Sequence, residues 1–177
     1  MTTTSPLPVA FQPMTRGRFT ILLAKEDFKF SAAHFTVFDS RRAELLHGHN
    51  YRVQVELAGE TLDEEGFLVD LDRMKSFVRA ACDALDERTL VPTDSPHVVV
   101  EERGDRVRVG FAERRYDLPS ADVRLLPLRN ITIEALAAYL WRELRTALED
   151  GPAERIDRLA VVVEETDGQR CAYSAPL

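Results

Sequence analysis

FKFSAAHFTVFDSRRAELLHGHNYRVQV, residues 28–55, is the stretch that decides the fold. It holds three of the four histidines, and two of them form a His-Gly-His unit. Side chains at positions i and i+2 share a face in a strand but diverge by about 200° in a helix. The residues that follow, from Tyr51 to Leu57, alternate between apolar and polar, which is a strand pattern. We therefore predict that His47 and His49 point the same way from the start of a strand.

His34 closes an earlier alternating run, residues 28–34. If the two runs pair as an antiparallel hairpin, the segment 35–46 brings His34 beside His47 and His49. Three imidazoles with no fourth protein ligand are typical of a catalytic zinc with one open position. A lone histidine is more often a surface or core residue than a ligand, so the prediction of zinc rests on all three together.

The composition limits the class of protein. With 177 residues, 45% of them hydrophobic and 30% charged, the chain has the size and make-up of one ordinary globular domain. The net charge of −7 disfavours a nucleic-acid partner, because phosphate binding requires a basic face. No apolar run approaches the ~20 residues that cross a bilayer. We expect neither nucleic acid nor a membrane as partner.

The N-terminal residues 1–17 lack the charged region and the continuous apolar segment of a secretory signal. We expect a flexible leader there, followed by a single domain over 18–177. Two cysteines, Cys82 and Cys171, are too few for a disulfide framework. Together these features predict a cytoplasmic protein.

The first half of the domain predicts two strands and a helix. Residues 18–34 form a strand whose apolar parity flips across 24–27, as at a β-bulge. A second strand runs over 47–58. After Asp70, a plausible N-cap, the apolar residues from 71 onward fall at helical spacing.

An inserted β-hairpin is predicted over about 92–125, around a Gly-Asp turn, and residues 115–118 could add a short strand. The insertion carries the fourth histidine, His97, which we leave outside the metal site. A second amphipathic helix follows, capped by Asn130 or Thr132, and a Gly-Pro pair at 151–152 ends it.

Two strands joined by a tight Asp-Gly turn, over 159–166 and 169–174, complete the chain. The element order β-β-α-(β-hairpin)-α-β-β predicts an α+β fold: an antiparallel sheet with two helices on one face. In the first of these strands Glu165 continues an apolar face, whereas Glu164 points the other way. A carboxylate there is costly unless donors satisfy it, and a ligand with two adjacent N–H groups would do so; the alternative is a strand end that reaches solvent.

Six segments of the chain resemble the 6-pyruvoyl-tetrahydropterin synthase and 6-carboxytetrahydropterin synthase family, whose architecture is the T-fold. They occur in the family's order and cover about 18–91 and 126–175. The segments are FSAAH (30–34), HGHNY (47–51), GFLVDLDRMK (66–75), LDE (85–87), NITIE (130–134) and VVVEET (161–166).

This resemblance implies a site, a substrate and an assembly. The zinc ligands would be His34, His47 and His49, and the pterin pocket would hold Glu165, Thr132 and Glu134. The substrate would be 7,8-dihydroneopterin triphosphate. Homo-oligomers, typically hexamers, would form by joining sheets between subunits, with active sites at the interfaces. A place in folate or queuosine biosynthesis would follow.

The chain departs from the family at its catalytic positions. Ala43 stands where the usual catalytic cysteine lies, four residues before the first His of HGH, and Asp86-Glu87 stands where the family has Asp-His. Glu44 follows Ala43 directly. This arrangement resembles the subgroup of the family in which glutamate replaces cysteine as the base. The alternative for Glu44 is a solvated loop residue.

These features lead to three hypotheses. The first is a zinc-dependent carbon-carbon or carbon-oxygen lyase that acts on the side chain of 7,8-dihydroneopterin or its triphosphate and releases 6-hydroxymethyl-7,8-dihydropterin, with Glu44 as base. The second is a 6-pyruvoyl- or 6-carboxy-tetrahydropterin synthase, in which Glu44 and Glu87, with Asp86, transfer protons. The third is a pterin-binding protein without catalytic activity.

Overall fold

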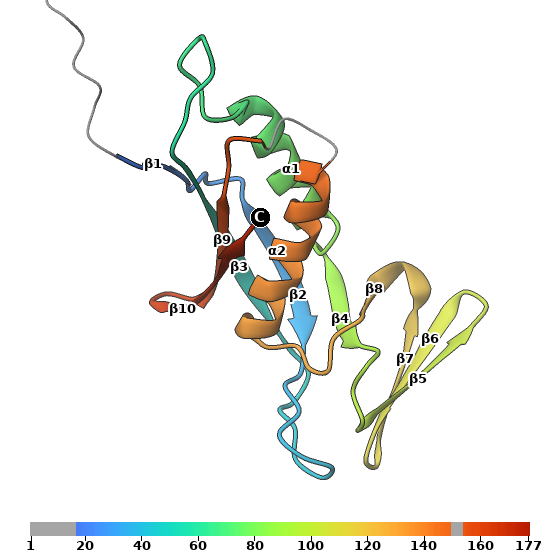
Figure 1. Ribbon diagram of the computed structural model, residues 1–177. Helices are drawn as coiled ribbons and strands as arrows, with labels where there is room; N and C mark the ends of the chain where they lie inside the picture. The colour runs from blue at the N-terminus through green and yellow to red at the C-terminus, as the bar shows by residue number, and fades with distance from the viewer. Residues whose placement is uncertain (1–16, 150–153) are drawn as a thin grey trace, which may run out of the picture.

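The computed structural model describes residues 17–149 and 154–177, in which a large sheet packs against two helices and a small sheet stands beside it (Figure 1). The large sheet contains, in spatial order, β10 (Gln169–Pro176), β9 (Arg158–Thr166), β3 (His47–Gly59), β2 (Lys29–His34), β4 (Arg88–Pro92) and β8 (Val123–Leu126), and β1 (Phe19–Leu23) also pairs with β3. The small sheet contains β5 (Val98–Arg103), β6 (Arg106–Phe111) and β7 (Arg114–Pro119). The helices are α1 (Leu71–Asp83) and α2 (Ile133–Glu149), and a short 3-10 turn, η1 (Ser120–Asp122), precedes β8.

Strand β3 is the centre of the large sheet. Its first half pairs with β2 and its second half with β1, while β9 pairs along the opposite edge. The predicted alternation is confirmed, because Tyr51, Val53 and Val55 are buried and Arg52 between them is exposed. The predicted parity flip is also present. The single strand predicted over 18–34 is wrong, however, because the flip separates two strands, β1 and β2, which contact different halves of β3.

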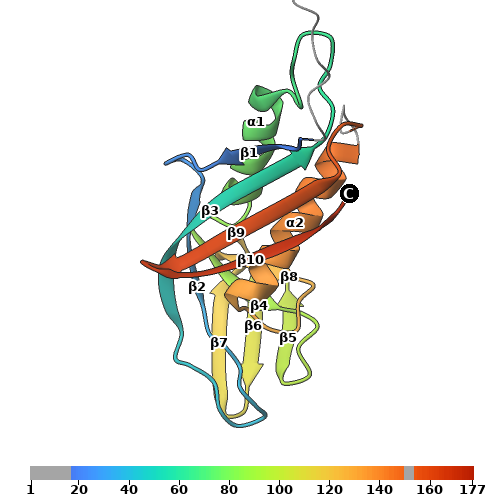
Figure 2. The same ribbon diagram turned by 60° about the vertical axis from the view of Figure 1, so that its left-hand side comes forward.

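Both helices cover one face of the sheet, and Figure 2 shows them behind β3 and β9. Asp70 caps α1 as predicted, since its side chain accepts hydrogen bonds from the backbone N–H groups of Asp72 and Arg73. Of the two candidate caps for α2, Thr132 fills the role: its Oγ1 accepts from the backbone N–H of Ala135 at 3.3 Å. These helices and strands enclose one large hydrophobic core, and the predicted α+β arrangement with both helices on one face of the sheet is confirmed.

The insertion is larger than one hairpin. Strands β5, β6 and β7 form a separate antiparallel sheet, and the flanking strands β4 and β8 extend the large sheet by parallel pairing with β2 and with each other. The large sheet is therefore mixed. A second core, distinct from the main one, lies between the small sheet and the segment 35–46.

Two predictions lie outside the described residues: the leader over 1–17, of which only the last residue is described, and the helix stop at 151–152. Among the helices that the structure describes, none is both long and apolar enough to cross a membrane.

Candidate active site

The three predicted imidazoles converge at one end of the sheet. His34 ends β2 and is the direct register partner of His47, the first residue of β3. Because His49 lies two residues farther along β3, its ring is on the same face. One ligand atom from each histidine falls within 4.8 Å of the others. The hairpin thus presents three nitrogen donors to one point, as the His-Gly-His pattern predicted.

In His34 and His47, Nδ1 lies near a backbone carbonyl, which leaves Nε2 of each ring available to bind a ligand. Nδ1 of His34 lies 3.2 Å from the carbonyl oxygen of Ile131, and Nδ1 of His47 lies 2.7 Å from that of Leu45. A ring that donates from Nδ1 to a carbonyl carries its lone pair on Nε2, which is how metal-binding histidines are usually oriented. Burial lowers the pKa of His34, so its ring is neutral at pH 7.

Nε2 of His34 is a buried polar atom that forms no hydrogen bond with any described residue. A buried donor or acceptor without a partner is costly. A metal ion at the meeting point of the three rings would satisfy this nitrogen. The residues present therefore fit a metal.

Glu165 reaches the same point from β9. Its Oε1 lies 3.3 Å from Nε2 of His34 and 3.7 Å from Nε2 of His49, and it accepts a 3.0 Å hydrogen bond from the Tyr51 hydroxyl. Its Oε2 accepts from the side-chain amide of Gln169 at 2.9 Å. The carboxylate is thus held by two neutral donors.

Glu164 is directed elsewhere, as strand alternation predicted. Its Oε1 accepts a hydrogen bond of 3.1 Å from the backbone N–H of Gly168 in the β9–β10 turn. It therefore takes part in the turn, whereas Glu165 faces the imidazoles.

Glu44 approaches from the segment between β2 and β3. Its Oε2 lies 4.0 Å from Nε2 of His47 and accepts from the backbone N–H of Thr36 at 3.1 Å. Partial burial alone would raise the pKa of Glu44, but the hydrogen bonds from Thr36 and the nearby imidazoles outweigh it and hold the pKa below its usual value. Glu44 is therefore an ionised carboxylate beside the imidazoles.

These groups line one cavity of about 390 Å3, in which Thr132 and Glu134 also lie at the N-terminus of α2. The lining residues are Thr36, Glu44, His47, His49, Thr132, Ile133, Glu134, Glu165, Thr166 and Gln169. A cavity of this size accommodates a small bicyclic ligand. Six of the nine residues singled out from the sequence line it, and His34 lies buried behind it beside Glu165.

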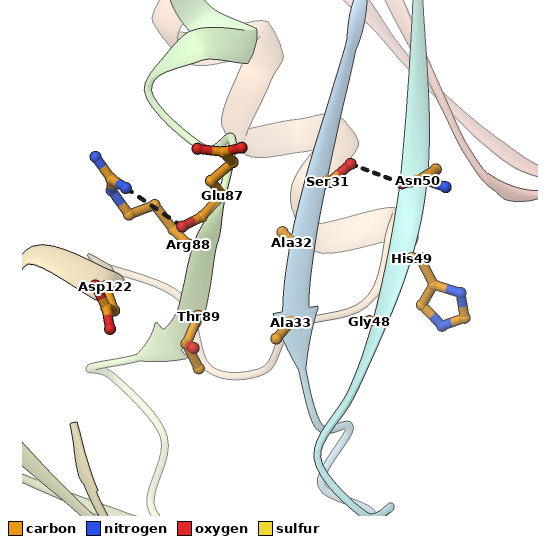
Figure 3. Close-up of a pocket in the computed structure, with 10 residues that line it drawn as sticks. All are labelled: Ser31, Ala32, Ala33, Gly48, His49, Asn50, Glu87, Arg88, Thr89 and Asp122. Carbon is orange, nitrogen blue, oxygen red and sulfur yellow. Dashed lines mark hydrogen bonds between the residues drawn. The ribbon is translucent and has the colours of Figure 1, made fainter. Parts of the chain in front are cut away.

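Asp86 and Glu87 do not reach this cavity within one chain. Oδ1 of Asp86 accepts from the backbone N–H of Ser31 at 2.6 Å, and Glu87, with a φ of 55°, lines a second pocket of about 450 Å3. Figure 3 shows that pocket between β4 and β3; of its residues, His49 turns its ring away from the others. Ser31 and Asn50, hydrogen-bonded across it, have the opposite strand parity to the three histidines. The pocket therefore opens on the other face of the sheet.

Neither cysteine belongs to the site. Cys82 is buried on α1, and burial raises the pKa of its thiol to about 12. Burial also raises the pKa of Cys171 on β10. The raised pKa values of both thiols disfavour a thiolate base at either position.

Two groups that hold the carboxylate of Glu165 were not predicted from the sequence. The first is Tyr51, which could have been found, because it continues the face of His47 and His49 along β3. The second is Gln169, which follows the last turn and gave no signal in the sequence.

Comparison with known proteins places this site in a family. The family model of 6-pyruvoyl tetrahydropterin synthase matches residues 23–176. A Methanocaldococcus jannaschii protein, provisionally named 6-carboxy-5,6,7,8-tetrahydropterin synthase, is 33% identical over 145 residues, which are 82% of this chain and 88% of that protein. The 6-carboxy-5,6,7,8-tetrahydropterin synthase of Bacillus subtilis is 29% identical over 162 residues, covering 91% of this chain and 90% of the relative.

Solved structures with a similar fold include members of the same family. A 6-pyruvoyl tetrahydropterin synthase from Plasmodium vivax superposes with a TM-score of 0.84 at 25% identity, covering 91% of this chain and 99% of the other. A further structure of the Plasmodium vivax enzyme, with the same TM-score and 24% identity, is described as a catalytic-residue mutant in which alanine replaces a glutamate. On the match of the family model over residues 23–176, this chain belongs to the 6-pyruvoyl tetrahydropterin synthase family.

Proposed function

We propose that this protein is a zinc-dependent lyase that acts on the side chain of 7,8-dihydroneopterin or its triphosphate, with Glu44 as the base. One observation carries the proposal: Oε2 of Glu44 lies 4.0 Å from Nε2 of His47, and Glu44 lines the same cavity as Glu165. A carboxylate base, two imidazoles and an acceptor for a heterocycle thus line one small cavity, with His34 behind it. The family supplies the substrate class.

Three imidazoles are a donor set that suits zinc, and His34, His47 and His49 would hold it. When bound, zinc would supply Lewis acidity to a side-chain hydroxyl of the substrate. Iron and copper also accept imidazole ligands, so the choice of zinc rests on the open three-histidine set and on the resemblance noted from the sequence.

Glu165 supports pterin binding. A pterin ring presents a ring N–H next to an amino group, and a carboxylate accepts both in a bidentate pair. Tyr51 and Gln169 hold the carboxylate in place before the ligand arrives, which lowers the cost of ordering it. Thr132 and Glu134 line the same cavity and would contact other edges of the ring.

Glu44 would start the reaction by taking the proton of the hydroxyl on the second side-chain carbon. The electron pair of that O–H bond forms a carbonyl, the bond between the first and second side-chain carbons breaks, and its electrons pass into the ring through the adjacent C=N bond. The proton then returns to the first carbon from Glu44. The products are 6-hydroxymethyl-7,8-dihydropterin and glycolaldehyde or its phosphorylated form. Only one protein base is required, and Glu44 lines the cavity.

The relatives favour a second candidate, a 6-carboxy- or 6-pyruvoyl-tetrahydropterin synthase. Those reactions move several protons along the side chain, and Asp86 and Glu87 lie outside the cavity of their own chain. They could act only at the site of a neighbouring subunit. We therefore couple this candidate to a homo-oligomer, for which we propose a hexamer with sites between subunits.

Product analysis distinguishes the candidates. The zinc-loaded protein is incubated with 7,8-dihydroneopterin and, separately, with its triphosphate, and the products are separated by chromatography. Equimolar 6-hydroxymethyl-7,8-dihydropterin and glycolaldehyde, or phosphorylated glycolaldehyde from the triphosphate, support the cleavage. A 6-carboxy or 6-pyruvoyl product establishes the synthase instead. No product from either compound, together with measurable pterin binding, would identify a binding protein.

A further inference from the structure

The small sheet packs directly against the segment that carries Glu44. The ring of Phe35 lies 5.8 Å from the ring of Tyr116 on β7 in a stacked arrangement, and 6.1 Å from that of Phe111 on β6. Phe35, Val37 and Phe111 are each at most 9% exposed and belong to the same second core. Figure 2 shows the loop between β2 and β3 running alongside β7. The small sheet therefore packs against this loop and stabilises it.

Arg114, the first residue of β7, makes a polar contact between the small sheet and this loop. Its Nη1 donates to the carbonyl oxygen of Glu44, and its Nη2 donates to that of Ala43 at 3.0 Å. The guanidinium also lies 5.7 Å from the centre of the Phe111 ring. A planar guanidinium with two donors on two successive carbonyls fixes direction as well as distance.

The other edge of the same short segment is held by backbone hydrogen bonds. The N–H of Glu44 donates to the carbonyl of Thr36 at 3.0 Å, and Val37 and Ala43 form an isolated antiparallel bridge. Asn130 in turn holds Val37 by donating to its carbonyl and accepting from its N–H. Arg114 binds the carbonyl oxygens of Ala43 and Glu44 on the opposite edge. The backbone at residues 43–44 is therefore restrained from both sides.

We propose that Arg114 is a positioning residue for Glu44: it sets the direction in which that side chain leaves the loop and thereby keeps the carboxylate beside His47. This inference rests on the proposed function only in taking Glu44 as the base. Arg114 has no role in binding the metal or the pterin, because it lines neither the cavity nor the imidazole cluster. A displacement of about 1 Å in a catalytic group can reduce the rate by about 100-fold.

Arg115 provides a matched control. It is the next residue on β7, it is exposed, and among the described residues it donates to the nearby carbonyls of Ala112 and Arg114. Replacing it removes an equal charge from the same strand without touching the loop. Arg114→Lys is the second test variant, because it keeps the charge and one donor and would fold where Arg114→Ala does not.

The first measurement is amide hydrogen exchange, which needs no turnover. In Arg114→Ala the N–H groups of Glu44 and Phe38, both bonded within the loop, should exchange at least about 10-fold faster than in the wild type. Arg115→Ala should leave both rates unchanged, and Arg114→Lys should lie between. Equal exchange in the Arg114 and Arg115 variants overturns the positioning role.

The second measurement is a double-mutant cycle on turnover. Arg114→Ala should lower kcat by about 10- to 100-fold with KM changed less than about threefold, because it misplaces the base and leaves the binding groups in place. In a Glu44→Gln background, Arg114→Ala should cause no further loss of kcat. A loss of the same size in both backgrounds would show that Arg114 acts through something other than Glu44. If the wild type turns over no dihydropterin, the proposed function fails, and the exchange comparison still decides whether Arg114 positions the loop.

Discussion

The hydroxyl of Tyr51 and the carboxylate of Glu165 meet across 3.0 Å although the two residues are 114 positions apart in the chain. Burial raises the pKa of Tyr51, and the charge of Glu165 raises it further, so the phenol keeps its proton and can only donate to that carboxylate. The contact leaves the remaining lone pairs of Glu165 to accept from a ligand.

Tyr51→Phe should therefore weaken pterin binding by about 1–2 kcal/mol, because the carboxylate loses a donor that holds it in place. Metal content should not change. Tyr173→Phe is the control and should bind as the wild type does, because Tyr173 on β10 packs edge-on against Trp141 and does not line the cavity. Calorimetric titration with a pterin measures both. Equal affinities in the two variants would show that the hydrogen bond to Glu165 does not orient it.

Glu165→Gln should weaken pterin binding by roughly 2–4 kcal/mol, since the amide places a donor against a donor where the carboxylate had two acceptors. Glu164→Gln is the matched control, because its side chain bonds to the backbone of the turn. It should change affinity little. Should the two variants lose equal affinity, the assignment of Glu165 as the anchor is wrong.

Metal analysis should find one zinc per chain. His47→Ala should lose most of it, because one of the three ligands is gone. His97→Ala should retain all of it, since His97 lines a separate hollow on the small sheet. Elemental analysis after dialysis gives the ratio. A protein without bound metal, or one in which His97→Ala loses as much as His47→Ala, contradicts the site.

Glu44→Gln should reduce turnover by roughly 10²- to 10⁴-fold, the usual cost of losing a general base. Zinc content and KM should stay close to those of the wild type, because Glu44 is no ligand in this proposal. Steady-state kinetics with either dihydropterin measures the effect. Unchanged kcat would remove Glu44 from the reaction.

Thiol alkylation should leave turnover intact. The pKa of Cys82 lies at about 12 and that of Cys171 is also raised, so at pH 8 both thiols are protonated and react slowly with iodoacetamide. Mass spectrometry of the folded protein should show Cys82 unmodified until denaturant is added. Inactivation that parallels the modification of Cys171 would point to a thiol in the mechanism.

Local patterns predicted the parts of the site that depend on strand alternation. The period of two residues places His47 and His49 on one face, and the same rule separates Glu165 from Glu164. Pairing of the two runs around residues 35–46 then brings in His34. Each of these inferences uses only neighbours in sequence, which is why they could be made without coordinates.

The remaining features depend on tertiary pairing. Strand β4 has no alternation to read, because Leu90 and Val91 are both buried, one on each face. Its parallel pairing with β2 is decided by packing between distant segments. The contacts of Gln169 with Glu165 and of Arg114 with the loop likewise depend on how β10 and the small sheet dock, and no local rule fixes either.

Strand β3 contributes to two contacts that differ greatly in sequence separation, one between His34 and His47 and one between Tyr51 and Glu165. The hairpin of His34 and His47 closes over residues 35–46, whereas Tyr51 meets Glu165 only when almost the whole domain has been brought together. Closing a longer loop costs more chain entropy, and a chain made from its N-terminus exposes the hairpin first. A nascent chain would therefore form the hairpin of His34 and His47 well before the contact between Tyr51 and Glu165. A metal captured at that stage would stabilise the β2–β3 pairing and provide the edge on which β9 later docks.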